Sequence, residues 1–167
     1  MTEHRIGLGV DVHRFVSDPE RAGGRALVLG GVAFPGSAPL EGHSDADAVA
    51  HAVADAILGA AGLGDLGSHF PDSDDEWLGA DSIVLLSRSA SSAAALGWRL
   101  VNADCTVVTE RPRLAPAREE MSARLSGAAG GPVHVKATRP EQLGSLGRVE
   151  GLACLAVALL ERGDPPR

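Results

Sequence analysis

The stretch HSDADAVAH, residues 43–51, places charged side chains at regular intervals in a segment otherwise rich in alanine, valine and leucine. On a helix, His43, Asp47, His51 and Asp55 recur every four residues and would lie along one face. Such a stripe on an otherwise apolar helix needs either a functional or a structural explanation. All four side chains can bind a metal ion, so we consider that chemistry first.

A second stretch, DVH at residues 11–13, offers groups of the same kind. In a strand, Asp11 and His13 project to the same side, so they could meet His51 at a single ion. Three ligands from Asp and His, with a fourth position left open, are typical of a catalytic Zn²⁺ site. The structural alternative is that Asp11 caps a turn and His51 is a hydrogen-bonded core histidine, and spacing alone leaves both readings open.

Hydrophobic periodicity predicts an α/β (α+β) fold: a single two-layer domain with a four-stranded mixed sheet and helices on one face. The expected strands are residues 5–13, 26–34, 98–109 and 134–138, the first two forming an antiparallel pair, and the expected helices are residues 44–62, 82–96, 116–126 and 151–161. The first helix would begin at Ser44, near a capping box, with His43 just outside it beside free backbone amides that suit an anion. We expect one catalytic domain over residues 1–162 and a flexible tail at residues 163–167.

Composition excludes several classes of partner. A net charge of −7, with 3% aromatic residues and no tyrosine, disfavours nucleic acid. No apolar run approaches the roughly 20 residues that cross a bilayer, and the N-terminus has no signal-peptide pattern. Cys105 and Cys154 lie in apolar segments, as reduced thiols in a cytoplasmic protein do.

The chain lacks the standard motifs of nucleotide loops and covalent catalysis. GLG at 7–9 and GLGDLG at 62–67 miss the full dinucleotide fingerprint and the P-loop ending. No serine sits in a nucleophile elbow and neither cysteine in an electropositive niche, which favours metal-assisted attack. The cationic and hydroxyl groups that could hold a nucleoside diphosphate at strand ends or in loops are Arg113, Lys136, Thr138, Arg139 and Arg148.

Six motifs extend this reading along nearly the whole chain. They are DVHRF at 11–15, LGG at 29–31, HSDADAVAHAVADAILGAAGLGDLGSHFPDSD at 43–74, GADS at 79–82, VKAT at 135–138 and LGRVEGLA at 146–153. Together they resemble the 2-C-methyl-D-erythritol 2,4-cyclodiphosphate synthases, with the long 43–74 block as the most specific part. The resemblance implies a phosphorus–oxygen lyase of the non-mevalonate isoprenoid pathway, and from the length we expect no fused cytidylyltransferase.

The resemblance also implies roles for individual residues. The zinc ligands would be Asp11, His13 and His51. Glu141 would hold a Mg²⁺ or Mn²⁺ ion at the diphosphate, and His43 and Arg139 would act in catalysis. The implied substrate-binding residues are Asp11, His13, His43, Ser44, Asp65, Leu66, Gly67, Phe70, Asp72, Thr109, Pro112, Arg113, Leu114, Ala115, Ala137, Thr138, Arg139, Glu141 and Arg148.

In this family the substrate is 4-diphosphocytidyl-2-C-methyl-D-erythritol 2-phosphate, whose own 2-phosphate attacks the β-phosphorus to give the cyclodiphosphate and CMP. The resemblance implies a cytoplasmic homotrimer with active sites between subunits. Two loops depart from the family pattern: TRPE at 138–141 replaces TTTE, and SLGRVE at 145–150 replaces FTGRGE. Two alternatives therefore stay open, a zinc-dependent phosphohydrolase and a non-catalytic trimer that senses an isoprenoid or a nucleotide.

Overall fold

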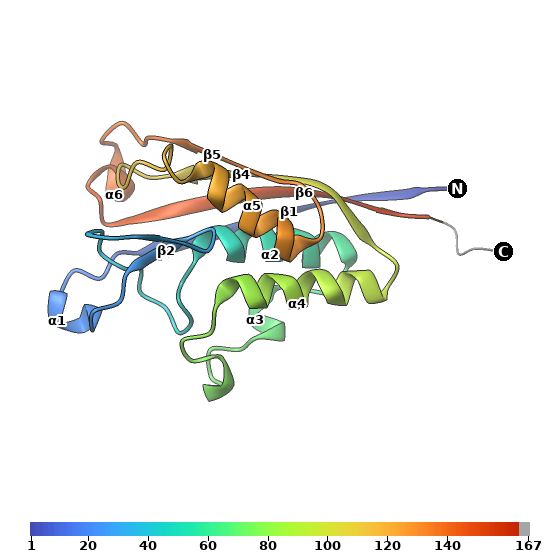
Figure 1. Cartoon of the computed structure of the whole chain (residues 1–167), viewed down its shortest axis with the longest axis horizontal. Helices are drawn as coiled ribbons and strands as arrows, with labels where there is room; N and C mark the ends of the chain where they lie inside the picture. The colour runs from blue at the N-terminus through green and yellow to red at the C-terminus, as the bar shows by residue number, and fades with distance from the viewer. Residues whose placement is uncertain (164–167) are drawn as a thin grey trace.

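The computed structural model describes residues 1–163 and contains a four-stranded mixed sheet in the order β1-β6-β4-β5 (Figure 1). The strands are β1 (Glu3–Arg14), β4 (Arg99–Val108), β5 (Val133–Thr138) and β6 (Gly151–Arg162). β6 pairs antiparallel with both β1 and β4, and β4 pairs parallel with β5. The predicted fold class, with a mixed sheet and helices on one face, is confirmed.

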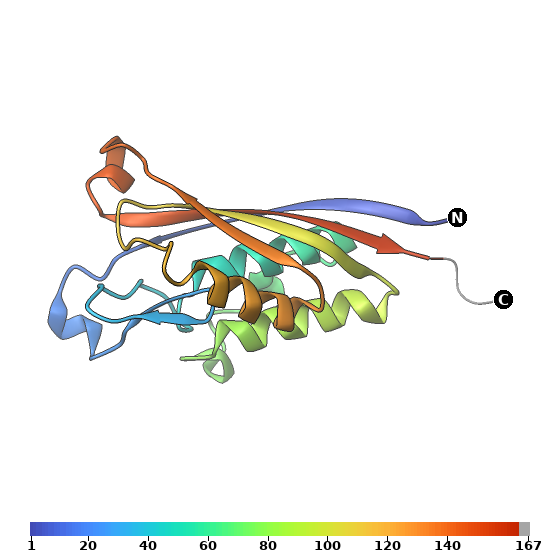
Figure 2. The same cartoon turned by 45° about the horizontal axis from the view of Figure 1, so that its top comes forward.

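The three long helices lie on one face of this sheet (Figure 2). They are α2 (Ala48–Ala61), α4 (Ser82–Ala95) and α5 (Arg118–Ala129). α2 packs against β1 and β6, α5 packs against β5, and α4 packs against both of these helices. In the part of the chain described, no helix is both long and apolar enough to cross a membrane.

The contact between α2 and β1 depends on glycine. Gly7 and Gly9 face the helix, and a Cβ atom at either position would overlap a carbonyl oxygen of α2, that of Ala56 or Ala52 respectively. Only a residue without a side chain allows backbones to approach this closely. The GLG motif is therefore a packing device, and it brings the first turn of α2 against the C-terminal half of β1.

The opposite face of β1 and β6 is apolar and exposed in the single chain. Its exposed apolar side chains are Ile6, Leu8, Val10, Val12, Leu155 and Val157, with exposed fractions between 40% and 73%. Leu8 pairs across the strands with Val157, and Val10 pairs with Leu155, so these side chains form one continuous surface. We call this surface the outer apolar face.

The prediction of a helix over residues 151–161 is wrong, because this segment is the central strand β6. Leu152 and Leu160 face the core, whereas Leu155 and Val157 belong to the outer apolar face. A strand with apolar side chains on both faces lacks the polar alternation that identifies strands in sequences. Its length and composition then match those of a buried helix.

The prediction of a single strand over residues 26–34, paired with the first strand, is also wrong. The segment is a hairpin of β2 (Leu27–Leu29) and β3 (Val32–Phe34), which forms a separate two-stranded sheet. Gly30 and Gly31 make the turn with φ of 57° and 74°. Two central residues with positive φ are typical of the type I′ turn that closes two-residue hairpins.

The other predicted elements occur within a few residues of their expected bounds. α4 is capped by Asp81, as predicted, whereas α2 begins after Asp47 and not at Ser44. Four short helices of the described residues lie outside the expected strands and helices: α1 (Pro19–Ala22), α3 (Leu66–His69), the 3₁₀ helix η1 (Asp75–Trp77) and α6 (Gly144–Gly147). Of the predicted tail, residues 164–167 lie outside the described residues.

Candidate metal centre and substrate pockets

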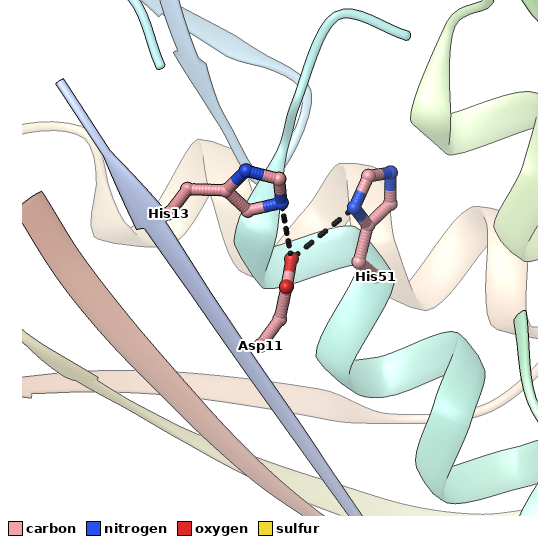
Figure 3. A group of neighbouring side chains, drawn as sticks. All are labelled: Asp11, His13 and His51. Atoms are coloured by element: carbon pink, nitrogen blue, oxygen red, sulfur yellow. Dashed lines mark hydrogen bonds and ion pairs between the residues drawn. The ribbon is translucent and has the colours of Figure 1, made fainter. Parts of the chain in front are cut away.

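Asp11, His13 and His51 converge on one point between β1 and the first turn of α2 (Figure 3). Asp11 Oδ2 lies 3.1 Å from His13 Nε2 and 3.2 Å from His51 Nδ1. In a tetrahedral site with ligand distances of about 2.0–2.1 Å, neighbouring ligand atoms are about 3.3 Å apart. The three groups therefore fit a divalent cation with a fourth position left free.

The electrostatics of these residues favour a charged carboxylate. Burial acts to raise the pKa of Asp11, but hydrogen bonds and charge from His13 and His51 outweigh it and hold the pKa well below its usual range. The hydrogen bond to Asp11 raises the pKa of His13, against the effect of burial. Asp11 is thus ionised at neutral pH, as a metal ligand must be.

Hydrogen bonds at the far side of each imidazole orient the rings. His13 Nδ1 lies 2.7 Å from the carbonyl oxygen of Glu41, which can only accept, so Nδ1 carries a proton and Nε2 is the nitrogen that faces Asp11. His51 Nε2 lies 2.8 Å from the hydroxyl of Ser82 and 3.3 Å from that of Ser44. Each ring therefore turns one nitrogen toward Asp11 and the other toward a partner in the protein.

Asp47 is not a ligand, although it belongs to the stripe. It is fully buried as the N-cap of α2, where Oδ1 accepts hydrogen bonds from the amides of Val49 and Ala50. The amides of Gly30 and Gly31 donate to the same carboxylate at 2.8 and 2.6 Å. Burial raises the pKa of Asp47 and the amide donors oppose that rise. Its role is to join the hairpin turn to the start of α2.

Asp55 likewise supports the backbone and does not orient an imidazole. Its carboxylate accepts a hydrogen bond from the amide of Leu66 at 2.7 Å. This bond ties the start of α3 to the middle of α2. The Nε2 atom of His51 instead contacts the hydroxyl of Ser82, at 2.8 Å.

His43 lies outside α2, as predicted, but not beside free helix amides. Because α2 starts at Ala48, its first amides are satisfied by Asp47. His43 Nε2 instead lies 3.1 Å from the carbonyl oxygen of Asp74. His43 and Ser44 line a hollow of about 590 Å³ together with Arg21 and Arg25, which the sequence reasoning missed. Arg21 lies in α1 and Arg25 shortly after it, both outside the expected strands and helices, and no spacing signal marks them.

A second hollow, of about 400 Å³, adjoins the metal centre itself. Its lining residues are Val10, Asp11, His51, Asp55, Asp65, Leu66 and Gly67. Asp65, Leu66 and Gly67, three of the implied substrate-binding residues, are among them. Phe70 and Asp72 do not line this hollow. The Phe70 ring packs edge-on against that of Trp77, with 5.0 Å between the ring centroids.

A third hollow, of about 250 Å³, lies at the C-terminal ends of β4 and β5. Its lining residues are Thr109, Glu110, Pro112, Arg113, Leu114, Ala115, Ala137, Thr138 and Arg139. All of these residues except Glu110 were expected to bind the substrate. Glu141 and Arg148 were also expected to bind it, but they do not line this hollow. Glu110 was missed, and it accepts a hydrogen bond from the amide of Gln142 at 2.6 Å. Arg148 pairs with Glu150 at 2.7 Å.

The metal centre and this third hollow lie at opposite edges of the sheet. β6 and β4 stand between β1 and β5. Three strand spacings of about 4.8 Å put the two edges roughly 14 Å apart. Within one chain, therefore, the third hollow does not face the ion.

Comparison with known proteins places these features in a family. A model described as the YgbB family matches residues 4–161. A 2-C-methyl-D-erythritol 2,4-cyclodiphosphate synthase from Rubrobacter xylanophilus is 53% identical over 165 residues, which are 97% of this chain and 98% of that protein. The bifunctional enzyme IspD/IspF from Anaeromyxobacter dehalogenans is 56% identical over 159 residues, but this chain spans only 39% of its length.

Solved structures agree with the sequence comparison. The bifunctional IspDF of Campylobacter jejuni superposes with a TM-score of 0.89 and 36% identity, covering 98% of this chain and 44% of that one. The IspF of Plasmodium falciparum, in a CDP complex, gives a TM-score of 0.81 and 28% identity over 96% of this chain and 97% of that one.

Proposed function

The chain belongs to the YgbB family, and on that premise we propose that it acts as a 2-C-methyl-D-erythritol 2,4-cyclodiphosphate synthase. The reaction would convert 4-diphosphocytidyl-2-C-methyl-D-erythritol 2-phosphate into the cyclodiphosphate and CMP. The observation that carries the proposal is the convergence of Asp11, His13 and His51 beside a hollow lined by Asp65, Leu66 and Gly67. We propose residues 1–162 as the catalytic domain.

We propose zinc as the ion at Asp11, His13 and His51. Two imidazoles and one carboxylate, with a free fourth position, are a ligand set that catalytic zinc uses. Bound there, zinc would polarise the β-phosphate of the substrate. For the second cation, Mg²⁺ or Mn²⁺, we propose Glu141, whose carboxylate is exposed at the turn after β5 and suits a hard ion.

Residues at both edges of the sheet would then hold one substrate. His43 and Ser44 would contact the 2-phosphate, with Asp65, Leu66, Gly67, Phe70 and Asp72 around the erythritol. The residues proposed for the cytidine diphosphate are Thr109, Pro112, Arg113, Leu114, Ala115, Ala137, Thr138, Arg139 and Glu141. Arg148 is the remaining proposed contact.

The chain's own residues would act chiefly by folding the substrate. The attacking 2-phosphate is part of the same molecule as its target, so positioning replaces a second binding event. A phosphate oxyanion is already a competent nucleophile, and His43 would orient it without acting as a base. Arg139 would neutralise charge at the diphosphate, in place of the hydroxyl usual in the family.

We propose a homotrimer with its active sites between subunits. Two observations support this assembly. The metal centre and the third hollow lie at opposite edges of the sheet, so a neighbouring subunit could bring the second edge to the first. The outer apolar face also gathers six exposed apolar side chains into one surface, as protein–protein interaction sites do.

The proposed compartment is the cytoplasm. Cys105 and Cys154 lie on neighbouring strands and both are free, buried thiols. A reducing compartment maintains thiols in that state.

The test is an assay of CMP release with the purified chain, Zn²⁺ and Mg²⁺, with ³¹P NMR of the product. The expected product is a ring diphosphate, and His51→Ala should abolish its formation. His4→Ala is the matched control, because His4 is exposed at the far end of β1. A linear phosphate product would instead indicate a phosphohydrolase. Zinc binding without any turnover would indicate a sensor.

A further inference from the structure

The imidazole of His51 is held on the side away from Asp11 by a buried serine. Ser82, the first residue of α4, is completely buried, and its Oγ lies 2.8 Å from His51 Nε2. Asp45 accepts a hydrogen bond from this hydroxyl and, at 3.1 Å, another from the amide of Ser82. Three residues from separate segments thus form one chain of hydrogen bonds that ends at the metal centre.

The direction of these hydrogen bonds follows from their chemistry. The Ser82 hydroxyl donates to a carboxylate oxygen of Asp45, so its hydrogen points toward that oxygen. The Ser82 oxygen is then left with lone pairs for His51, and Nε2 must carry the proton. With a metal ion bound between His51 and Asp11, Nδ1, which lies 3.2 Å from Asp11 Oδ2, would then be the nitrogen that binds it.

Backbone hydrogen bonds hold the same segments together. The amide of Asp45 donates to the carbonyl oxygen of Ala80 at 3.1 Å, and the amide of Gly79 donates to that of His43 at 2.8 Å. The segment that carries His43 and Ser44 is thus fixed alongside the start of α4. Asp45 and Ser82 connect the substrate-facing segment to His51.

We propose that Asp45 and Ser82 are positioning residues for the metal centre, which set the tautomer and the ring orientation of His51. The proposal rests on the metal site of the proposed function and not on the reaction it performs. It assigns a function to the GADS motif at 79–82, which otherwise only begins a helix. Ser44 is the weaker partner, because its oxygen lies farther from Nε2, at 3.3 Å, and already accepts from the amide of Ala46.

The first test measures zinc affinity of the full chain by competition with a chromophoric chelator. Ser82→Ala should weaken binding by about 10–100-fold, the usual effect of losing a hydrogen-bond partner of a metal ligand. Ser82→Thr retains the hydroxyl and should restore most of the affinity. Ser89→Ala is the matched control, since Ser89 is a fully buried serine of the same helix that bonds only to the carbonyl oxygen of Leu85.

The outcomes separate positioning from simple packing. Unchanged affinity in Ser82→Ala would overturn the proposal, as would an equal loss in Ser89→Ala. If Ser82→Ala does not fold, Asp45→Asn takes its place: it retains the shape but removes the charge, and a several-fold loss is expected. No loss in that variant would overturn the proposal.

A second measurement reads the tautomer directly. In ¹⁵N NMR of the zinc-loaded wild-type chain, His51 should carry its proton on Nε2 and bind through Nδ1. A proton on Nδ1, with binding through Nε2, would contradict the proposed role of the hydrogen bonds from Asp45 and Ser82 to His51. Neither experiment needs substrate, so failure here is distinguishable from failure of the proposed synthase activity, which the CMP assay reports.

Discussion

The two faces of β1 differ in what they pack against. The residues that face α2 are small or polar: Gly7, Gly9, Asp11 and His13. The residues that face away are branched and apolar: Ile6, Leu8, Val10 and Val12. An ordinary half-buried strand has the reverse arrangement, with its large apolar side chains inside. The inner face is thus shaped by the close approach of α2 and by the cluster of Asp11 and His13 with His51, whereas the outer face suits the subunit contact that we propose.

The largest expected effect comes from filling the inner face. Gly9→Val should destabilise the chain by at least about 4 kcal/mol, because its Cβ would overlap the carbonyl oxygen of Ala52 and displace α2. Urea denaturation measures the stability. Leu8→Val, on the outer face of the same strand, is the control. A Gly9→Val protein with normal stability and normal zinc binding would refute the close-approach argument.

A second effect concerns the inner face of β6. Leu160 is completely buried under the helices, and Leu160→Ala should cost about 3 kcal/mol in the free energy of unfolding. Leu155→Ala makes the same change on the outer face, where the side chain is 40% exposed in the single chain. We expect the loss in the free energy of unfolding of Leu155→Ala to depend on protein concentration. Equal, concentration-independent losses at both positions would contradict the difference between the faces.

A third effect tests the assembly through the outer apolar face. Val157→Asp should leave the subunit folded, with a change below about 1 kcal/mol, because Val157 is 46% exposed in the single chain. A buried, unpaired carboxylate at a subunit interface is costly, however, so the trimer that we propose should dissociate. Light scattering reports the mass and circular dichroism the fold. A trimer that survives the substitution would show that this face is not the interface.

The smallest effect is expected where the outer side of the sheet turns polar. On β5 and β4, Lys136 forms an ion pair with Asp104, and both side chains are about half exposed. Lys136→Ala should change the free energy of unfolding by no more than about 0.5 kcal/mol, since exposed pairs contribute little. Thermal denaturation at low and high salt measures it, with Asp104→Ala as the reciprocal variant. A loss above 1 kcal/mol would mean that the interface extends across the whole sheet.

The contrast between the two faces of the sheet also explains which parts of the fold and of the candidate site could be predicted from the sequence. The cluster of Asp11, His13 and His51 was predictable because the alternation of Asp11 and His13 and the helical position of His51 are local. β6 was not, because apolar residues on both sides, Leu155 and Leu160 among them, hide the alternation. The hydrogen-bond partners of these residues could not be predicted either. Ser82 contacts His51, and Asp47 accepts from the amide of Gly30, only because segments distant in the sequence pack together.

The turn between β2 and β3 has a consequence for hydrogen exchange. Amide hydrogens in a two-residue turn normally exchange quickly with solvent, yet those of Gly30 and Gly31 are bonded to the buried carboxylate of Asp47. Their exchange requires the N-terminus of α2 to separate from the hairpin, which is a larger opening than fraying of the turn. The rate of deuterium uptake at these two glycines would therefore report how often the N-terminal end of α2, which carries His51, separates from the hairpin.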